Sequence, residues 1–138
     1  MRKASSSHGI SVTFDIRPAI LGQAAYPATI RLVAPITLDY NLTFDGPGAD
    51  QLTINGDSDT NGVGDIQLFT VNATVTMNRL AFTKGYASFG GGAFEVNTDG
   101  DLTLNYCAVT DCTADVWGGG VDVNLGSLRM LFTTSDRG

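Results

Sequence analysis

The sequence has very few of the residues that favour helices. It contains one Glu against thirteen Asp, a single His and four Pro, but seventeen Gly, in 138 residues. Glu is a good helix former, whereas Asp and Gly favour turns, so a helical bundle is excluded. Charged residues make up only 16% of the chain, and its surface must therefore be covered mainly by uncharged polar side chains. The length is that of one domain.

The balance of charge excludes whole classes of partner. The chain carries 8 Lys and Arg against 14 Asp and Glu, a formal net charge of -6. Nucleic acid and anionic lipid gain nothing from an acidic surface, so we expect neither as a partner. No run approaches the roughly 20 apolar residues of a membrane-spanning helix, and residues 1–9 lack the apolar core of a signal peptide. We therefore expect no membrane insertion and no signal peptide within this chain.

Nucleophilic and zinc chemistry find little support in the sequence. His8 is the only histidine. It falls in residues 1–10, which we expect to be a disordered leader, so a Ser–His–Asp or Cys–His arrangement lacks a base. Cys107 and Cys112 are separated by about 16 Å of extended chain, beyond the roughly 7 Å Cα limit of a disulfide. They are also too few for zinc, and we predict two free thiols, with Cys107 buried.

Two short patterns recur along the chain. An apolar-x-apolar-Asn pattern occurs at Leu52–Asn55, Phe69–Asn72, Phe94–Asn97 and Val121–Asn124. A longer pattern occurs at Ile36–Asp39, Val75–Asn78, Leu102–Asn105 and, in degraded form, at Leu128–Met130. Alternation with a period of two residues predicts strands with one buried face. From residue 69 onward the copies are 25 to 27 residues apart, a period typical of a solenoid.

Copies one period apart stack in a solenoid as parallel strands about 4.8 Å apart. We therefore predict an all-β fold, a parallel β-helix with two inward rows. One row is Leu38, Met77, Leu104 and Met130, and the other is Phe44, Phe82 and Val109. The Asn residues at strand ends predict side-chain amide ladders. These ladders are Asn78 with Asn105, and Asn72 with Asn97 and Asn124.

Two glycine triplets fit the same register. Each follows an aromatic residue and precedes a strand pattern, Phe89 before Gly90–Gly92 and Trp117 before Gly118–Gly120. Phosphate binding by such triplets needs a following helix, which is not predicted here. Phe89 and Trp117, one coil apart, suggest either an exposed aromatic surface for sugar rings or a mutual contact at a corner.

The repeats resemble a known family. The runs Asn41–Gly56, which includes Gly-Pro-Gly-Ala-Asp, Ala73–Thr83 and Gly91–Phe94 are similar to bacterial right-handed parallel β-helix repeat proteins. These are exported proteins related to polymorphic outer-membrane proteins and autotransporter passengers, and the resemblance covers about residues 11–135. It implies a right-handed β-helix and a secreted or cell-surface setting for the full-length parent. It implies no activity, because the coil rather than a catalytic motif defines the family.

The ends of the chain depart from that family. A short helical segment usually precedes the first strand in the family, whereas only a Ser-rich leader precedes Ser11. The last copy, Leu128–Thr134, is degraded. We therefore expect residues 11–138 to form a single β-helix domain of about four to five coils, a fragment truncated at both ends. Open coil ends expose strand edges, so we expect self-association through them.

One loop has the spacing of a calcium site. Oxygen donors stand at positions 1, 3, 5 and 9 of a loop with Gly at position 6, and a backbone carbonyl is available at position 7. The predicted ligands are Asp57, Asp59, Asn61, Val63 and Asp65. Position 12 is Leu68 rather than the Glu of an EF-hand, so any Ca²⁺ affinity should be weak. The alternative is a solvated, mobile acidic loop.

The sequence favours a binding role over catalysis. We expect a non-catalytic β-helix module of a secreted or cell-surface, adhesin-like protein whose partner is a polysaccharide or a host surface ligand. The alternative is a carbohydrate-binding or polysaccharide-degrading fragment, of the lyase or glycosidase type, that uses carboxylates with a basic residue. Its candidates are Asp99, Asp101, Asp111, Asp115 and Asp122, with Arg79, Lys84 and Arg129. We expect these carboxylates to be turn residues.

Overall fold

The computed structural model describes residues 10–14 and 27–135, and the described chain is all β, with no helix. The strands are short, as expected for alternating patterns bounded by turn residues. In chain order they are β1 (Ile10–Thr13), β2 (Ala28–Arg31), β3 (Ile36–Leu38), β4 (Leu42–Asp45), β5 (Leu52–Asn55), β6 (Phe69–Val71), β7 (Thr74–Asn78), β8 (Ala81–Thr83), β9 (Tyr86–Ala87), β10 (Phe94–Val96), β11 (Asp101–Asn105), β12 (Ala108–Thr110), β13 (Thr113–Ala114), β14 (Val121–Val123), β15 (Ser127–Leu131) and β16 (Thr134–Ser135).

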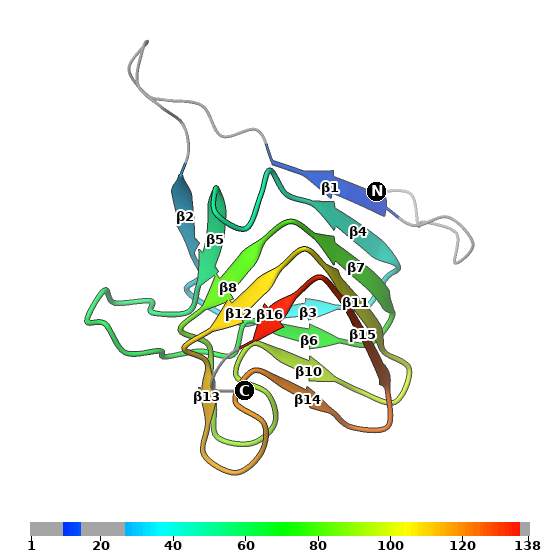
Figure 1. The fold of residues 1–138 in the computed structure, drawn as a ribbon. Helices are drawn as coiled ribbons and strands as arrows, with labels where there is room; N and C mark the ends of the chain where they lie inside the picture. The colour runs from blue at the N-terminus through cyan, green and yellow to red at the C-terminus, as the bar shows by residue number, and fades with distance from the viewer. Residues whose placement is uncertain (1–9, 15–26, 136–138) are drawn as a thin grey trace, which may run out of the picture.

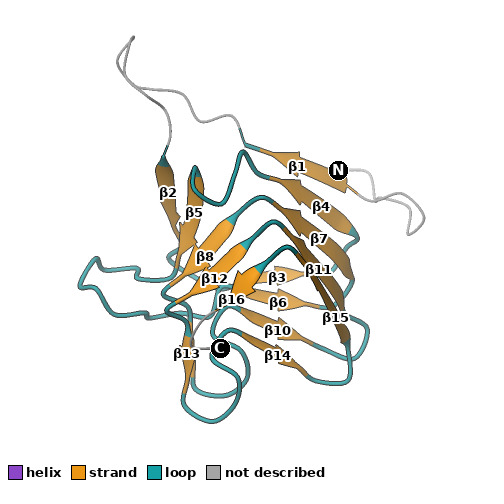
Figure 2. Ribbon diagram, viewed as in Figure 1, coloured by secondary structure: helices purple, strands orange, loops and turns teal. Residues whose placement is uncertain are grey.

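The strands stack as a parallel β-solenoid of about four turns (Figures 1 and 2). Three long sheets run along it, with strand orders β1-β4-β7-β11-β15, β16-β12-β8-β5-β2 and β14-β10-β6-β3, and β9 pairs with β13 at a corner. Each named strand pairs in parallel with its counterpart one coil away, for example β7 with β11. The predicted fold class is therefore confirmed. Strand β1 starts at Ile10, and the expected leader, with His8, otherwise lies outside the described residues.

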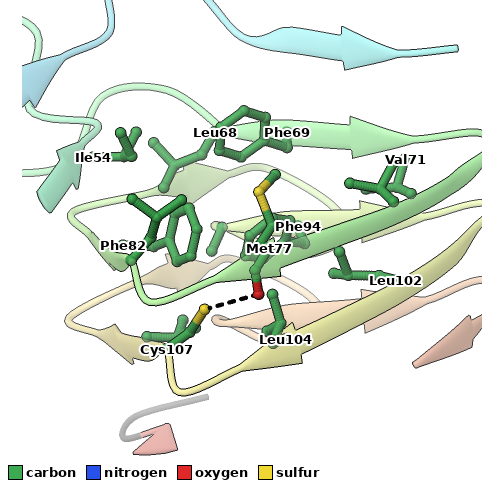
Figure 3. Close-up of a cluster of buried hydrophobic side chains, with 14 of the residues drawn as sticks. Ile54, Leu68, Phe69, Val71, Met77, Phe82, Phe94, Leu102, Leu104 and Cys107 are labelled. Carbon is green, nitrogen blue, oxygen red and sulfur yellow. Dashed lines mark hydrogen bonds between the residues drawn. The ribbon is translucent and has the colours of Figure 1, made fainter. Parts of the chain in front are cut away.

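The core fills the inside of the coils (Figure 3). Phe44, Met77, Leu104 and Met130 form one inward row, and Ile54, Phe82 and Val109 form another. Phe69, Phe82 and Phe94 meet between the sheets, with ring centroids 4.9 to 5.9 Å apart. Phe82 and Phe94 are completely buried. Aromatic contacts of this kind add to the free energy gained by burying apolar surface.

The predicted register is wrong for the first copies. Leu38 pairs with Val71 rather than with Met77, and Phe44 pairs with Met77 rather than with Phe82. The strand Leu52–Asn55 likewise lies beside β8, whereas the other three apolar-x-apolar-Asn copies share the sheet of β6, β10 and β14. The register from residue 69 onward is as predicted.

A longer coil causes this error. Asp45 and its ladder partner Asn78 are 33 residues apart, whereas Asn78 and Asn105 are 27 apart. Much of the excess lies in the turn from Gly46 to Gln51, which is longer than the link between β7 and β8. Gly46 is required there, because a β-carbon would lie 2.4 Å from the carbonyl oxygen of Arg79. A constant period therefore misplaces β3 and β4, whose partners β6 and β7 lie 33 residues later.

The amide ladders form at two corners. Asn105 Nδ2 donates to Asn78 Oδ1 at 2.9 Å, and Asn97 Nδ2 donates to Asn72 Oδ1 at 2.8 Å. Both ladders then continue to a carboxylate, because Asn78 donates to Asp45 and Asn72 donates to Asp39, each at 2.8 Å. The predicted ladders are confirmed for these two pairs. Asn124 follows in the second row, where its backbone N–H donates to the Val96 carbonyl at 2.7 Å.

Neither cysteine forms a disulfide, and Cys107 is buried, as predicted; Cys112 is buried as well. Cys107 occupies the slot held by Leu80 in the preceding coil, and its Sγ donates to the Met77 carbonyl oxygen at 3.3 Å (Figure 3). Burial raises the pKa of the Cys107 thiol above its usual value. A protonated thiol is a small apolar side chain with a weak donor, which suits this position. Among the described residues there is no helix of the length and apolarity needed to cross a membrane.

Replacing Phe82 should test the core directly. Phe82→Ala should lower the free energy of unfolding by about 3–5 kcal/mol, because the ring is fully buried and contacts two other rings. Chemical denaturation followed by circular dichroism measures the change. Phe89→Ala is the matched control, since that ring is 65% exposed and should cost about 1 kcal/mol or less. Equal effects of the two variants would contradict the assigned core.

Candidate binding site

Two loops at one corner of the solenoid carry an exposed aromatic pair. Phe89 lies between β9 and β10 and Trp117 between β13 and β14, one coil apart. Their ring centroids are 6.0 Å apart with the planes tilted by 52°. The side chains are nevertheless 65% and 60% exposed. The mutual contact is therefore confirmed, and both rings also face solvent, whereas sugar binding stays a prediction.

The glycine triplets hold the two loops close together. The backbone N–H of Gly92 donates to the Gly119 carbonyl at 2.7 Å, and a β-carbon at Gly92 would lie 2.5 Å from that oxygen. Gly90 adopts a φ of +71°, and a β-carbon there would overlap the carboxylate of Glu95. Both positions need glycine, the first for close approach and the second for backbone conformation as well. The loops are thus fixed to each other and to the sheet.

A pair of carboxyl groups lies beside the first of these loops. Glu95 in β10 and Asp122 in β14 are register partners, and the Gly91 N–H donates to Glu95 Oε1 at 3.3 Å. Burial and the charge of the neighbouring Asp122 raise the pKa of Glu95. The carboxylate of Asp122 thus disfavours ionisation of Glu95.

Glu95 was not among the residues proposed from the sequence. It is the only glutamate of the chain, and it occupies the outward position of an apolar-x-apolar-Asn strand. Asp122 occupies the same position one copy later, so aligning the two copies would have revealed the pair. Nothing in the composition alone marks it.

The other predicted carboxylates are held in separate contacts or lie at turns. Asp111 is 3.5 Å from Lys84 Nζ, and Asp115 accepts a hydrogen bond from the Tyr86 hydroxyl at 2.6 Å. Arg79, one of the predicted basic residues, forms an ion pair with Asp45 instead, with Nη2 3.2 Å from Oδ1. The remaining candidates Asp99 and Arg129 are exposed, and Asp101 lies in β11. The expectation that these carboxylates are turn residues is wrong for Asp101 and Asp122, which lie in strands, and Asp122 is the register partner of Glu95.

The acidic loop between β5 and β6 brings three carboxylates together. Oxygen atoms of Asp57, Asp59 and Asp65 all lie within 4.8 Å of one another. Asp57 is only 4% exposed and accepts hydrogen bonds from the backbone N–H groups of Gly62 at 2.7 Å and Asn61 at 3.1 Å. The sequence-based interpretation of an entirely solvated loop is therefore wrong for Asp57.

The two other predicted ligands, Asn61 and Val63, form hydrogen bonds within the loop. Asn61 Oδ1 accepts a hydrogen bond from the Val63 N–H at 2.8 Å, and Asn61 Nδ2 donates to Asp59 at 3.2 Å. The side chain of Val63 is exposed. Arg31 from the preceding coil also reaches the loop, with Nη1 3.9 Å from Asp57 Oδ2.

The charges of this loop are unevenly compensated. Burial alone would raise the pKa of Asp57, but the two backbone N–H donors and Arg31 outweigh it, and the pKa is lowered. The pKa of Asp59 is raised, by burial and by the nearby carboxylates Asp65 and Asp57. Backbone donors thus favour the charged form of Asp57, whereas the neighbouring carboxylates disfavour the charged form of Asp59.

Comparison with protein-family models, curated proteins and solved structures finds no match to the chain. The parallel solenoid is therefore the part of the family resemblance that the structure supports.

The raised pKa of Glu95 gives stability a distinct dependence on pH. A carboxyl group with a raised pKa in the folded state contributes full stability below its unfolded pKa, near 4.5. It loses this contribution as pH rises through the folded value. Glu95→Gln imitates the protonated form, so the variant should melt at a higher temperature than the parent near pH 7, with the difference shrinking toward pH 4. Thermal melting across this range measures it.

The control is Asp122→Asn. It removes the neighbouring charge while leaving Glu95 in place, so the pKa of Glu95 should fall toward its usual value and the pH dependence should weaken. A melting-temperature difference for Glu95→Gln that is constant with pH would rule out the raised pKa of Glu95.

Proposed function

We propose that this chain is a non-catalytic β-solenoid module of a secreted or cell-surface, adhesin-like protein, and that it binds a polysaccharide or host surface glycan through Phe89 and Trp117. The observation that carries the proposal is the exposure of these two rings on loops that the coil register fixes in place. The right-handed β-helix repeat family named above is the family that we propose for it.

Rigid exposed rings suit carbohydrate recognition. Aromatic side chains supply a large apolar area, and sugar rings present apolar C–H faces that stack on them. Because the glycine contacts already fix both loops, little conformational entropy is lost when a ligand binds. The nearby carboxyl pair, Glu95 and Asp122, supplies acceptors for sugar hydroxyl groups. The surface thus combines an apolar platform with polar groups that fix orientation.

The alternative is polysaccharide cleavage by the same surface, and the carboxyl pair is the observation that favours it. A general acid needs a raised pKa, as Glu95 has. However, glycosidases place their two carboxyl groups about 5–5.5 Å apart, or about 6.5–9.5 Å apart, to leave room for the sugar or a water. Glu95 and Asp122 are register partners on neighbouring strands of one sheet, so they lie side by side rather than on either side of a sugar bond. This geometry supports binding over hydrolysis.

We also propose that the acidic loop binds Ca²⁺ weakly. The convergence of three carboxylates supports this proposal, since Ca²⁺ prefers oxygen ligands. The hydrogen bonds within the loop hold it folded, so a cation has little chain to order. Arg31 already compensates part of the charge, which favours a low affinity.

A glycan array with the aromatic variants tests the proposed function. Trp117→Ala and Phe89→Ala should each weaken binding to the glycans that the parent protein binds, because each removes one of the two rings. The expected loss is about tenfold in affinity, which corresponds to about 1.4 kcal/mol. Val116→Thr is the control, since Val116 is an equally exposed neighbour and should leave binding unchanged. Reducing-sugar release from the bound glycan would overturn the non-catalytic proposal, and its loss in Glu95→Gln would assign the reaction to the carboxyl pair.

Calorimetry with Ca²⁺ tests the acidic loop. The parent should give a weak binding heat and a higher melting temperature with Ca²⁺, and both should disappear in Asp59→Asn. Asp59→Asn removes a charge without removing the backbone hydrogen bonds of Asp57, so the variant should fold normally. Without Ca²⁺ it should melt slightly above the parent, because the repulsion among the three carboxylates is reduced. A parent that shows neither heat nor a melting shift would refute the calcium proposal.

A further inference from the structure

The last coil carries apolar residues at three outward positions where at least one earlier coil carries a polar residue. Leu131 takes the ladder position held by Asn105 and Asn78. Phe132 follows it, as Tyr106 follows Asn105. At the other end of β15, Leu125 follows Asn124 in the way that Thr98 follows Asn97. We call Leu125, Leu131 and Phe132 the C-terminal rim.

The rim is strongly exposed. Leu125 is 80%, Leu131 50% and Phe132 73% exposed. Phe132 is also stacked on Tyr106, with centroids 5.2 Å apart, which holds its ring at the corner. Between the two ends of the rim runs β15, and on its far side no strand of the described chain pairs with it. An apolar rim beside an open strand edge is a surface suited to association.

Two inward positions of the same coil change from apolar to polar. Ser135 stands in the row of Val109 and Phe82. Thr133 takes the slot of Cys107, where its Oγ1 donates to the Leu104 carbonyl at 2.9 Å and accepts from the Cys107 N–H at 3.2 Å. A further parallel coil would need apolar side chains at these positions. The last coil therefore closes this part of the interior with polar groups and moves apolar surface outward.

We propose that the C-terminal rim binds a second copy of this chain, with the two β15 strands antiparallel across a twofold axis. Leu125 precedes β15, and Leu131 and Phe132 stand at its other end, so antiparallel pairing brings the Leu125 of each copy to the Leu131 and Phe132 of the other. The rim is thus complementary to itself, as a closed twofold interface requires. Antiparallel pairing also satisfies the backbone groups of both edges.

Head-to-tail stacking fits the same residues poorly. The row that ends in Leu131 begins at Thr13 in β1, through Asp45, Asn78 and Asn105. Placing β1 of one copy on β15 of another would set the apolar Leu131 against the polar Thr13. It would also generate an open filament rather than a closed dimer.

The test uses the full chain in sedimentation velocity across the micromolar range. The parent should show a monomer–dimer equilibrium with no larger species. The triple variant Leu125→Thr, Leu131→Asn and Phe132→Arg, which introduces the residues of the inner coils at Thr98, Asn105 and Arg79, should weaken dimerisation about a hundredfold or more. Val33→Thr is the control, because Val33 is 83% exposed near the other end and should leave the dimer intact.

Hydrogen exchange of the unmodified protein gives a second measurement that needs no variant. Amides of β15 should become protected as concentration rises, while those of β1 should not. Circular dichroism establishes that the triple variant is folded, and Leu125→Thr alone replaces it if it is not. A parent that stays monomeric, a dimer insensitive to the rim variants but sensitive to Val33→Thr, or species that grow beyond the dimer would each overturn the proposal.

Discussion

In-register stacking of the coils is the constraint on which the rest of the structure depends. Each named strand pairs only with the equivalent strand of neighbouring coils, so a side chain is buried or exposed according to its position in the row rather than its neighbours in sequence. Successive residues of a strand face opposite sides, and a shift by one residue would turn Phe82 and Val109 outward together. The register therefore fixes the core, the corners and the loops at once.

The corners show how strongly the register determines the backbone. Arg79, Tyr106 and Phe132 follow equivalent strands and have φ values of +57°, +56° and +47°. Non-glycine residues in this region are strained, and they persist where the surrounding structure leaves no other conformation. Here the strands before and after each corner are already paired with a neighbouring coil. The same rigidity extends to the loops that carry Phe89 and Trp117, whose glycines allow the backbones of adjacent coils to touch.

The sequence was sufficient to predict the solenoid, its period from residue 69 onward, the Asn ladders and the burial of Cys107, because each follows from a repeated position. It was insufficient for the first coils. The apolar-x-apolar-Asn pattern of Leu52–Asn55 occurs in all three sheets, so the pattern alone does not decide its sheet. The turn after Asp45 lengthens the coil that separates β3 and β4 from β6 and β7. The aromatic pair was likewise predictable from its glycine triplets. Glu95 was missed because its significance lies in its register partner Asp122 rather than in its own surroundings.

The amide ladders make the two ends of the solenoid chemically different. In each of the four ladder hydrogen bonds, the Asn Nδ2 group of the later coil donates to the side-chain oxygen of the earlier coil. Asp39 and Asp45 stand on the N-terminal side of their ladders, and an ionised carboxylate suits this place because it accepts hydrogen bonds and donates none. An Asn there would bring an amide N–H group that needs a further acceptor. Carboxylates therefore stand at the N-terminal end of both ladders. At the other end of the ladder of Asn78 and Asn105, Leu131 takes the ladder position. The two ends of the solenoid thus differ in their side chains as well as in their backbone.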